Sequence, residues 1–372
     1  MISKPNKVHI DLAALAQNLD QIRSLLATST RIMGVVKADA YGHGLLPISR
    51  TLEQNRIDCL GVAYLKEALF LRKNGSKLPI MVLCGINTME ESQKVVENNL
   101  TPVIYDPVVA EILSRESISQ GKRTRVHIKV DTGMGRLGIH YQDIGNFVKK
   151  IISLKGLEVE ALITHLSSAD EQEQTFTTTQ IQNFKMAIQV VQALGLELPL
   201  NNMANSAGIM KYKDSHFKLV RPGIALYGGL PANDFVSPVR LKPVMTFYGQ
   251  VLQIRDMQEN TPLSYARTHY TKGARRIAIL SAGYSNGLSR LLSNRGKVII
   301  RGIEFPIVGR ICMNLTICDI TGSNAIQPGD KAVFLGSQGD TDITAEKIAH
   351  WADTISYEVF CSIGQKNNKE YV

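Results

Sequence analysis

Up to Val220, the apolar positions of the chain fall into short runs that alternate with helical patterns. Asp11 is followed by LAALAQNLDQIRSLLA, where apolar residues recur at helical spacing behind an Asp N-cap, so we expect a helix there. TMEESQKVVENN and QIQNFKMAIQVVQALG show similar helical patterns. The intervening apolar runs predict strands at Ile32–Val36, Leu60–Ala63, Ile80–Leu83, Pro102–Tyr105, Val126–Val130, Val159–Thr164, Leu198–Asn202 and Phe217–Val220.

Eight strand–helix units in about 230 residues are typical of a (β/α)8 TIM-type barrel. Such a barrel carries its chemistry at the C-terminal ends of its strands. A doubly wound open sheet is the main alternative, but eight strands are more than such a sheet usually needs. We therefore expect an α/β barrel in this part of the chain.

The pattern changes at GGLPANDFVSP, which is rich in Gly and Pro and is typical of a domain boundary. The segments beyond it are mostly β-rich, and TAEKIAHWADT is the only helix that we expect there. The prediction is a barrel domain at residues 1–234 and a mostly-β C-terminal domain at residues 235–372. The first ten or so residues are a candidate strand of the β domain.

Composition and charge narrow the class of protein. Hydrophobic residues make up 44% and charged residues 20%, which is ordinary for a globular chain. Nothing resembles a signal peptide or a run of about 18 apolar residues, so we expect no membrane segment. The 5 cysteines are scattered, which argues against disulfides and a metal site and favours the cytoplasm. The net charge of +9 is mostly dispersed, unlike the basic stripes of nucleic-acid binders.

One basic stretch, from Arg267 to Arg310, holds nine Lys or Arg and a single acid, Glu304. A solvated basic face is the simpler interpretation of this stretch. The alternative is a positive approach to a site that takes anionic ligands.

The chemistry is concentrated in VVKADAYGHG, where Lys37 directly follows the first predicted barrel strand. An apolar setting can hold a lysine partly deprotonated, as Schiff-base formation requires. The string closely resembles the pyridoxal-phosphate attachment signature of alanine racemases. Other segments resemble the same family in the same order: KVDTGMGRLG, ITHLSSAD, MANSAG, RPGIALYG, SYARTH, GYSNG, VGRICMN and ISYEV.

The resemblance implies pyridoxal 5'-phosphate as the cofactor and assigns it binding residues. Lys37 would carry the cofactor covalently, and Arg221 would face its ring nitrogen. A guanidinium stays protonated, so it would donate a hydrogen bond there without transferring a proton, which limits side reactions such as transamination. The residues implied at the phosphate are Tyr41, Ser206, Gly223, Ile224 and Tyr357.

The resemblance also implies a racemase with two bases on opposite faces of the substrate Cα. Lys37 would serve one face, and Tyr265, assisted by His165, the other. Arg136 and the backbone at Met313 would meet the substrate carboxylate, with Tyr284 at the substrate entrance. Lys129 is similar to a lysine that is often carbamylated. Asp170, Arg290 and Arg310 match positions further out along the entrance.

The positions of these residues fit a barrel independently of the family. The residues implied at the site that closely follow strands predicted from the pattern are Lys37, Arg136, His165, Ser206 and Arg221. The last two predicted strands are followed by small residues around Ser206 and Gly223, where barrels often bind phosphate.

Members of the family are head-to-tail homodimers, so Tyr265 of one site is expected from the partner. The expected reaction interconverts L- and D-alanine and supplies D-alanine for peptidoglycan. Asn286 and Asn314 stand where the family usually has a carboxylate, which bears on substrate breadth. The alternatives are a serine or broad-specificity racemase, an amino-acid decarboxylase and a non-catalytic cofactor-binding protein.

Overall fold

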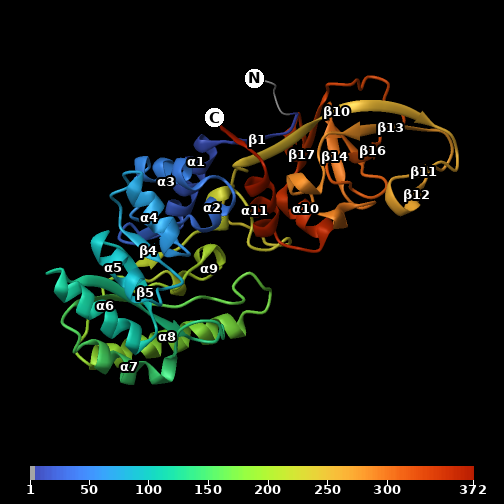
Figure 1. Cartoon of the computed structure of the whole chain (residues 1–372). Coiled ribbons are helices and arrows are strands. Elements are labelled where there is room, and N and C mark those ends of the chain that lie inside the picture. The colour runs from blue at the N-terminus through green and yellow to red at the C-terminus, as the bar shows by residue number, and fades with distance from the viewer. Residues whose placement is uncertain (1–4) are drawn as a thin grey trace.

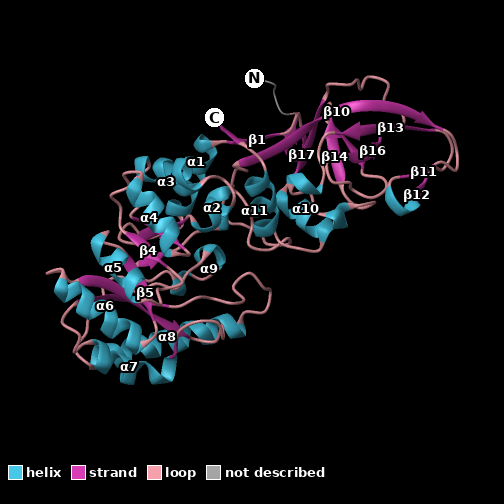
Figure 2. Cartoon of the chain, in the orientation of Figure 1, coloured by secondary structure: helices cyan, strands magenta, loops and turns pink. Residues whose placement is uncertain are grey.

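A closed parallel barrel and a largely antiparallel sheet make up the structure, a computed structural model that describes residues 5–372. Figure 1 shows the barrel, blue to yellow, on one side and the β-rich part, orange to red, on the other. Figure 2 shows helices around the barrel strands and the long strands gathered in the other part. The predicted fold class is therefore confirmed.

The barrel closes through parallel pairing of neighbouring strands. β2, β3, β4, β5, β6 and β8 pair in that order, and β9 returns to β2. Between β8 and β9 the chain contributes a single bridging residue, Asn202, so the strand predicted at Leu198–Asn202 is reduced to one bridge. The strands are β2 (Arg31–Val35), β3 (Cys59–Val62), β4 (Ile80–Val82), β5 (Thr101–Ile104), β6 (Thr124–Asp131), β7 (Ile139–His140), β8 (Leu157–Ile163) and β9 (Leu219–Val220).

Helices cover the outside of the barrel. α1 begins behind Asp11, whose side chain accepts from Ala14 N at 2.8 Å, as its N-cap position predicted. Leu15, Leu19 and Ile22 of α1 are fully buried, and burying each stabilises the fold by about 1.5–3 kcal/mol. The helices are α1 (Leu12–Ser24), α3 (Leu45–Gln54), α4 (Leu65–Lys73), α5 (Met89–Glu97), α6 (Pro107–Ser119), α7 (Ile144–Ile151), α8 (Thr175–Ala193) and α9 (Ser206–Lys211). No helix within residues 5–372 is both long and apolar enough to cross a bilayer.

The β-rich part is built around β10, which pairs antiparallel with β1, β13 and β17. β1 also pairs with β19 in parallel, so strands from near the two ends of the chain lie side by side. The strands are β1 (Lys7–Ile10), β10 (Met245–Met257), β11 (Pro262–Leu263), β12 (His269–Tyr270), β13 (Arg275–Leu280), β14 (Lys297–Ile300), β15 (Ile303–Pro306), β16 (Thr316–Asp319), β17 (Lys331–Gln338), β18 (Thr341–Ile343) and β19 (Lys369–Tyr371).

The expectation of one helix in this part is wrong, because α10 (Ala345–Ala352) is followed by α11 (Ser356–Lys366). The segment SYEVFCSIGQK is rich in β-branched, aromatic and small residues, which favour strands or loops in isolation. Its buried Val359, Phe360 and Ile363 recur at helical spacing and pack into the core. Tertiary packing therefore decides the conformation of this segment.

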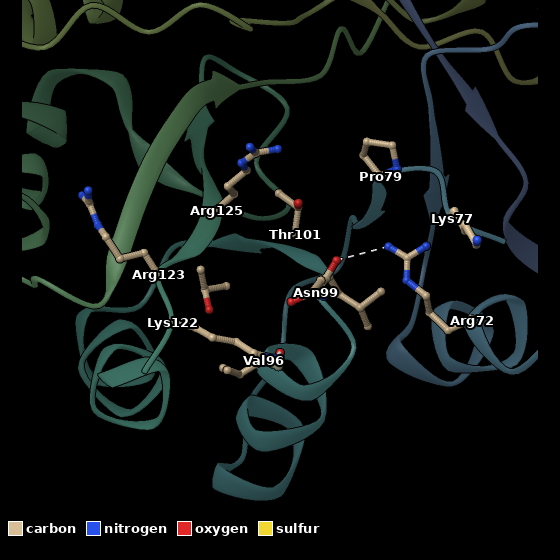
Figure 3. A pocket seen from close by; sticks show the side chains of 11 residues that line it. Arg72, Lys77, Pro79, Val96, Asn99, Thr101, Lys122, Arg123 and Arg125 are labelled. Atoms are coloured by element: carbon tan, nitrogen blue, oxygen red, sulfur yellow. Dashed lines mark hydrogen bonds between the residues drawn. The ribbon is translucent and has the colours of Figure 1, made fainter. Parts of the chain in front are cut away.

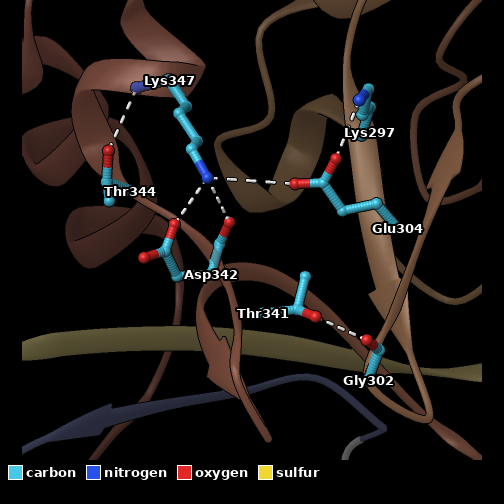
Figure 4. Close-up of polar contacts among 7 residues, drawn as sticks. All are labelled: Lys297, Gly302, Glu304, Thr341, Asp342, Thr344 and Lys347. Atoms are coloured by element: carbon cyan, nitrogen blue, oxygen red, sulfur yellow. Dashed lines mark hydrogen bonds and ion pairs between the residues drawn. The ribbon is translucent and has the colours of Figure 1, made fainter.

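Surface ion pairs attach α10 to two neighbouring hairpins, β17–β18 and β14–β15 (Figure 4). Lys347 Nζ lies 2.6 Å from Asp342 Oδ1 and 3.9 Å from Glu304 Oε1, and Glu304 also binds Lys297 Nζ at 2.8 Å. These groups are partly exposed, so each pair contributes at most about 1 kcal/mol.

One buried amide joins the two parts of the chain. Asn18 of α1 donates to Leu226 O at 3.1 Å and to Lys242 O at 2.8 Å, and it accepts from Lys242 N at 2.7 Å. A buried amide with its partners satisfied is costly to disturb. Asn18 therefore fixes the segment that leads from the barrel to β10.

Candidate active site

A cavity of about 350 Å³ opens at the C-terminal ends of the barrel strands. This is the end where barrels carry their chemistry. The residues implied by the sequence that line it are Lys37, Tyr41, Lys129, Arg136, His165, Ser206, Arg221, Gly223, Ile224 and Tyr357. The structure thus brings most of the predicted site residues together.

The turn that follows Lys37 has a left-handed backbone. Ala38, Asp39, Ala40 and Tyr41 have φ angles of 55°, 56°, 53° and 54°, a conformation that costs an L-residue roughly 1–2 kcal/mol each. No glycine in the turn signals this, so the sequence did not predict it. Strain of this kind persists where the surrounding structure enforces it, commonly at functional sites.

Hydrogen bonds and an ion pair with neighbouring elements hold the turn in place. Ala38 N donates to Glu67 Oε1 at 2.7 Å, and Leu45 N donates to Asp39 Oδ1 at 2.7 Å. Asp39 Oδ2 also forms an ion pair with Lys369 of β19 at 2.9 Å. The turn carries Lys37 at its start and Tyr41 at its end, so these bonds position two residues that line the cavity.

The cavity is strongly cationic. Among its lining residues in the described chain there is no Asp or Glu. Burial, followed by the charge of Arg136, lowers the pKa of Lys37. Burial also lowers the pKa of Lys129 to about 7 and holds that of His165 well below its ordinary value. Uncompensated cations in a concave site point to an anionic ligand.

Arg221 lies on the cavity floor against backbone and side-chain acceptors. It is 5% exposed, and its Nη1 donates to Asn202 Oδ1. Its Nη2 donates to Thr164 O at 2.5 Å and to Met203 O at 3.1 Å, and lies 3.4 Å from His165 Nδ1. Burial lowers the pKa of Arg221 to about 9, which leaves it protonated at neutral pH. The guanidinium is therefore held as a fixed hydrogen-bond donor.

Ser206 and Gly223 form a cradle at one side of the cavity. Ser206 Oγ accepts from Gly223 N at 3.0 Å and from Ala225 N at 3.3 Å. A Cβ at Gly223 would collide with the Tyr41 hydroxyl, so glycine is required for this close approach. The rings of Tyr41 and Tyr357 lie 5.9 Å apart. Burial raises the pKa of both phenols, so both remain proton donors.

The implied residues that lie on the β-rich part and do not line this cavity are Tyr265, Tyr284, Arg290, Arg310 and Met313. Tyr265 is 64% exposed and Met313 is 56% exposed. Tyr284 N donates to Cys312 O at 3.0 Å, and Ser264 Oγ donates to Arg310 O at 2.5 Å. Their loops are thus joined through the segment around Cys312.

The backbone around Tyr265 resembles the Lys37 turn in being strained. Ser264, Ala266 and Arg267 have φ angles of 60°, 56° and 51°. Figure 1 shows β11 and β12, which flank this segment, at the far end of the β-rich part from the barrel. The chain therefore presents two separate groups of implied residues, one at the barrel mouth and one on the β-rich part.

The sequence missed several residues that line the cavity: Tyr64, Leu83, Cys84 and Leu137. Leu83 and Cys84 directly follow β4, and Tyr64 lies just after β3. The position of these residues just after barrel strands was the one feature of the sequence that could have identified them as cavity residues. α11 was also missed, although it carries Tyr357 in its first turn.

A second cavity, of about 330 Å³, lies at the N-terminal ends of the barrel strands (Figure 3). The Arg72 guanidinium donates to Asn99 O at 3.1 Å, and Lys122 Nζ donates to Val96 O at 2.7 Å. Figure 3 shows the Arg123 side chain pointing away from Arg72. These cationic side chains donate hydrogen bonds to backbone carbonyls and do not point toward a common ligand position. The Lys37 cavity is therefore the better candidate for the active site.

Comparison with known proteins gives matches along both parts of the chain. The alanine racemase N-terminal domain matches residues 10–231, and the alanine racemase C-terminal domain matches residues 244–371. An alanine racemase of Syntrophobacter fumaroxidans is 42% identical over 364 residues, which cover 98% of this chain and 96% of that protein.

Solved structures agree with the sequence matches. The alanine racemase of Clostridium difficile 630 has a TM-score of 0.92 at 32% identity and covers 100% of this chain and 97% of its own. The alanine racemase of Bartonella henselae with covalently bound pyridoxal phosphate has a TM-score of 0.89 at 29% identity and covers 100% of both chains. With domain matches on both parts of the chain and a relative at 42% identity along nearly all of it, the chain belongs to the alanine racemase family, whose members depend on pyridoxal 5'-phosphate.

Proposed function

We propose that this protein interconverts L- and D-alanine with pyridoxal 5'-phosphate bound in the Lys37 cavity. The observation that carries the proposal is the lowered pKa of Lys37 in a cavity lined by several cationic side chains. Among the residues that the structure describes, no Asp or Glu lines this cavity. Membership of the alanine racemase family indicates which reaction to expect. The cavity at the barrel mouth has the cationic side chains that this reaction needs.

The residues present fit the cofactor. Lys37 offers the amine for its aldehyde, and Arg221 offers a fixed donor for its ring nitrogen. The phosphate fits the cradle, where the donors are the hydroxyls of Tyr41, Ser206 and Tyr357 and the backbone N–H of Ile224. When bound, pyridoxal phosphate withdraws electrons from the substrate Cα and makes its proton acidic.

Lys37 is proposed to move the proton on one face of Cα. Its lowered pKa increases the share of neutral amine that can accept a proton near neutral pH. Arg221 donates a hydrogen bond and keeps its own protons, so it orients the ring without making it a strong electron sink. This restrains side reactions such as transamination.

Tyr265 is proposed to move the proton on the opposite face, with His165 of the other subunit as its hydrogen-bond partner. Because Tyr265 lies outside the lining of the cavity of its own chain, the proposal requires a homodimer in which each barrel mouth receives the β-rich part of the partner. Its 64% exposure leaves it available for such a contact.

Arg136 and the backbone at Met313 are proposed to bind the substrate carboxylate, and Tyr284 to line the entrance. Lys129 is proposed to carry a carbamate. Its pKa of about 7 provides neutral amine to attack CO2, and the product would place a negative charge beside Arg136. The reaction forms one N–C bond and releases one proton.

The test is a racemisation assay on the purified protein. We expect a visible absorbance band from the bound cofactor, and formation of D-alanine from L-alanine faster than D-isomers form from a panel of other L-amino acids. Lys37→Ala should lose the band. Tyr265→Phe should keep the band and lose most racemisation, by about 10²–10⁴-fold in kcat.

Three outcomes would overturn the assignment. Faster racemisation of serine or of many amino acids would favour a broader racemase, for which Asn286 and Asn314 are the first residues to examine. A cofactor band without turnover would indicate a non-catalytic binding protein. Full activity of Tyr265→Phe would remove Tyr265 from its role.

We also propose that the product supplies D-alanine for peptidoglycan and that the enzyme works in the cytoplasm. The cysteines support the latter, because all are free in the structure as a reducing compartment requires. Deleting the gene and supplying D-alanine to the growth medium would test both the need for the product and its use.

A further inference from the structure

A line of polar side chains runs from the floor of the active-site cavity into the interior of the barrel. Arg221 Nη1 donates to Asn202 Oδ1, and Asn202 Nδ2 lies 3.3 Å from His127 Nδ1. His127 Nε2 lies 3.3 Å from Glu160 Oε2. Asn202 and His127 are fully buried, and the Glu160 side chain is 20% exposed at the far end. The catalytic scheme above uses only Arg221.

The amide of Asn202 gives this line a direction. A side-chain amide oxygen only accepts hydrogen bonds, and its nitrogen only donates. Asn202 Oδ1 accepts from Arg221, so Nδ2 faces His127 and also donates to Leu200 O at 2.9 Å. His127 Nδ1 must therefore carry a lone pair and no proton. The proton of the neutral ring then lies on Nε2, where it can be donated to Glu160.

The opposite arrangement is excluded by donor–donor contact. A proton on His127 Nδ1 would face the Asn202 amide nitrogen. Rotating the amide by half a turn would relieve that contact, but it would point the nitrogen at the Arg221 guanidinium. Each misdirected group would be a buried donor without an acceptor, which costs roughly 1–3 kcal/mol. Only one direction satisfies all members of the line.

We propose that Asn202, His127 and Glu160 are positioning residues that hold Arg221 in place for the ring nitrogen of the cofactor. Glu160 accepts the Nε2 proton of His127 and so selects the tautomer. The tautomer fixes the orientation of the Asn202 amide. The amide oxygen then fixes Arg221 Nη1. The expected effect on catalysis rests on the role proposed for Arg221 in the reaction. The expected tautomer of His127 does not depend on that role.

Barrel interiors are usually packed with branched apolar side chains. Replacing a buried polar pair by well-packed apolar residues is often neutral or stabilising. A line of polar groups that ends on a guanidinium in the cavity is therefore better explained by orientation of that guanidinium than by stability. A positioning role and a stabilising role therefore give different experimental readouts.

The first experiment is ¹⁵N NMR of the histidine-labelled protein, with the His127 signal assigned by its loss in His127→Phe. We expect a neutral ring with a protonated Nε2 and an unprotonated Nδ1. A ring protonated at Nδ1, or at both nitrogens, at neutral pH would overturn the proposal. This readout holds whether or not the protein racemises alanine, so it separates failure of this inference from failure of the proposed function.

The second experiment compares His127→Phe with His127→Gln, whose oxygen can accept from Asn202 and whose nitrogen can donate to Glu160. We expect His127→Phe to lower kcat by about 10- to 100-fold, with KM for alanine nearly unchanged. Its cofactor absorbance band should shift, and slow loss of the cofactor through transamination should increase. His127→Gln should restore much of kcat. Unchanged kcat and absorbance in a folded His127→Phe would contradict a positioning role.

Glu160→Gln keeps the proposal falsifiable if His127→Phe does not fold, because Glu160 is partly exposed. Glu158→Gln on the same strand is its matched control, since Glu158 lies 4.0 Å from Arg125 and outside the line. We expect Glu160→Gln to lower kcat and to give a mixture of His127 tautomers, and Glu158→Gln to change neither. Equal behaviour of the two variants would refute the role of Glu160.

Discussion

The cations of the barrel mouth illustrate how burial sets the chemistry of single residues. Lys37 and Lys129 carry the same functional group, yet their positions differ. Lys37 sits on a strained turn at the cavity mouth, and Lys129 lies near the end of β6, where burial lowers its pKa to about 7. The position of Lys37 suits proton transfer, and the position of Lys129 suits reaction with CO2.

The lowered pKa of Lys129 predicts how stability varies with pH. Its folded-state pKa of about 7 lies below the ordinary 10.5, so between these values the unfolded chain binds a proton that the folded chain lacks. The free energy of unfolding should therefore rise with pH across this window through this residue. In CO2-free buffer, urea unfolding should show a steeper rise for the natural protein than for Lys129→Met. Parallel curves for the two proteins would contradict the lowered pKa.

Gly223 predicts a steric effect on cofactor binding. A methyl group there would collide with the Tyr41 hydroxyl, so Gly223→Ala should weaken cofactor affinity at least about tenfold, the equivalent of ~1.4 kcal/mol. Titration of cofactor into the cofactor-free protein measures this affinity. Adding Tyr41→Phe removes the hydroxyl that would lie 2.3 Å from the new methyl group and leaves the ring carbon Cζ at 3.0 Å, so the double variant should regain part of the thermal stability that Gly223→Ala loses and still bind the cofactor weakly. If the losses of thermal stability of the two single variants simply add in the double variant, Gly223 and Tyr41 are not in contact.

Residue roles were predictable from sequence to different degrees. Lys37, Arg221 and Gly223 stand in motifs that resemble the family, and the structure places them together. His127 and Asn202 stand in strand-like apolar segments without any motif. Their relation is a hydrogen bond across the barrel between residues 75 apart in the chain, which no local pattern can reveal.

At the level of elements, the barrel strands were predictable because buried parallel strands form short apolar runs bounded by turns. α11 was not predictable in the same way, since its helical conformation depends on packing against α10 and against α2 (Lys37–Tyr41), the left-handed turn at the cavity. The left-handed turn after Lys37 was not predictable either, because alanine does not signal positive φ.

The left-handed turn predicts an unusual response to glycine. Glycine adopts φ near +55° without steric cost, so Ala38→Gly should leave the free energy of unfolding unchanged or raise it by up to about 1 kcal/mol. Ala16→Gly in the right-handed α1 is the matched control and should lower it by about 1 kcal/mol. Denaturant titration measures both. Similar losses in the two variants would show that the turn stores no strain.

At the scale of the whole molecule, the two groups of site residues lie on different parts of the chain. The Lys37 cavity opens at the barrel mouth, and Tyr265 projects from the β-rich part. The sequence alone could not place them together, since the proposed contact joins two copies of the chain. Only the resemblance to a family indicated it.

Mixing two inactive variants tests that arrangement. Lys37→Ala and Tyr265→Phe should each be inactive. In a mixed dimer, one site would hold both substitutions and the other none. Random reassociation at equal amounts should therefore restore about a quarter of the natural activity. No recovery, despite mixed dimers seen by native mass spectrometry, would show that each site is built from one chain.

The pairing of β1 with β10 and β19 has a consequence for synthesis on the ribosome. β1 cannot complete its pairing until β10 and β19, which lie much later in the chain, have been synthesised. Lys369 and Tyr357, which reach the Lys37 turn and the phosphate cradle, are made after all the barrel strands. Vitamin B6 capture should therefore be completed only after the ribosome has passed Lys369.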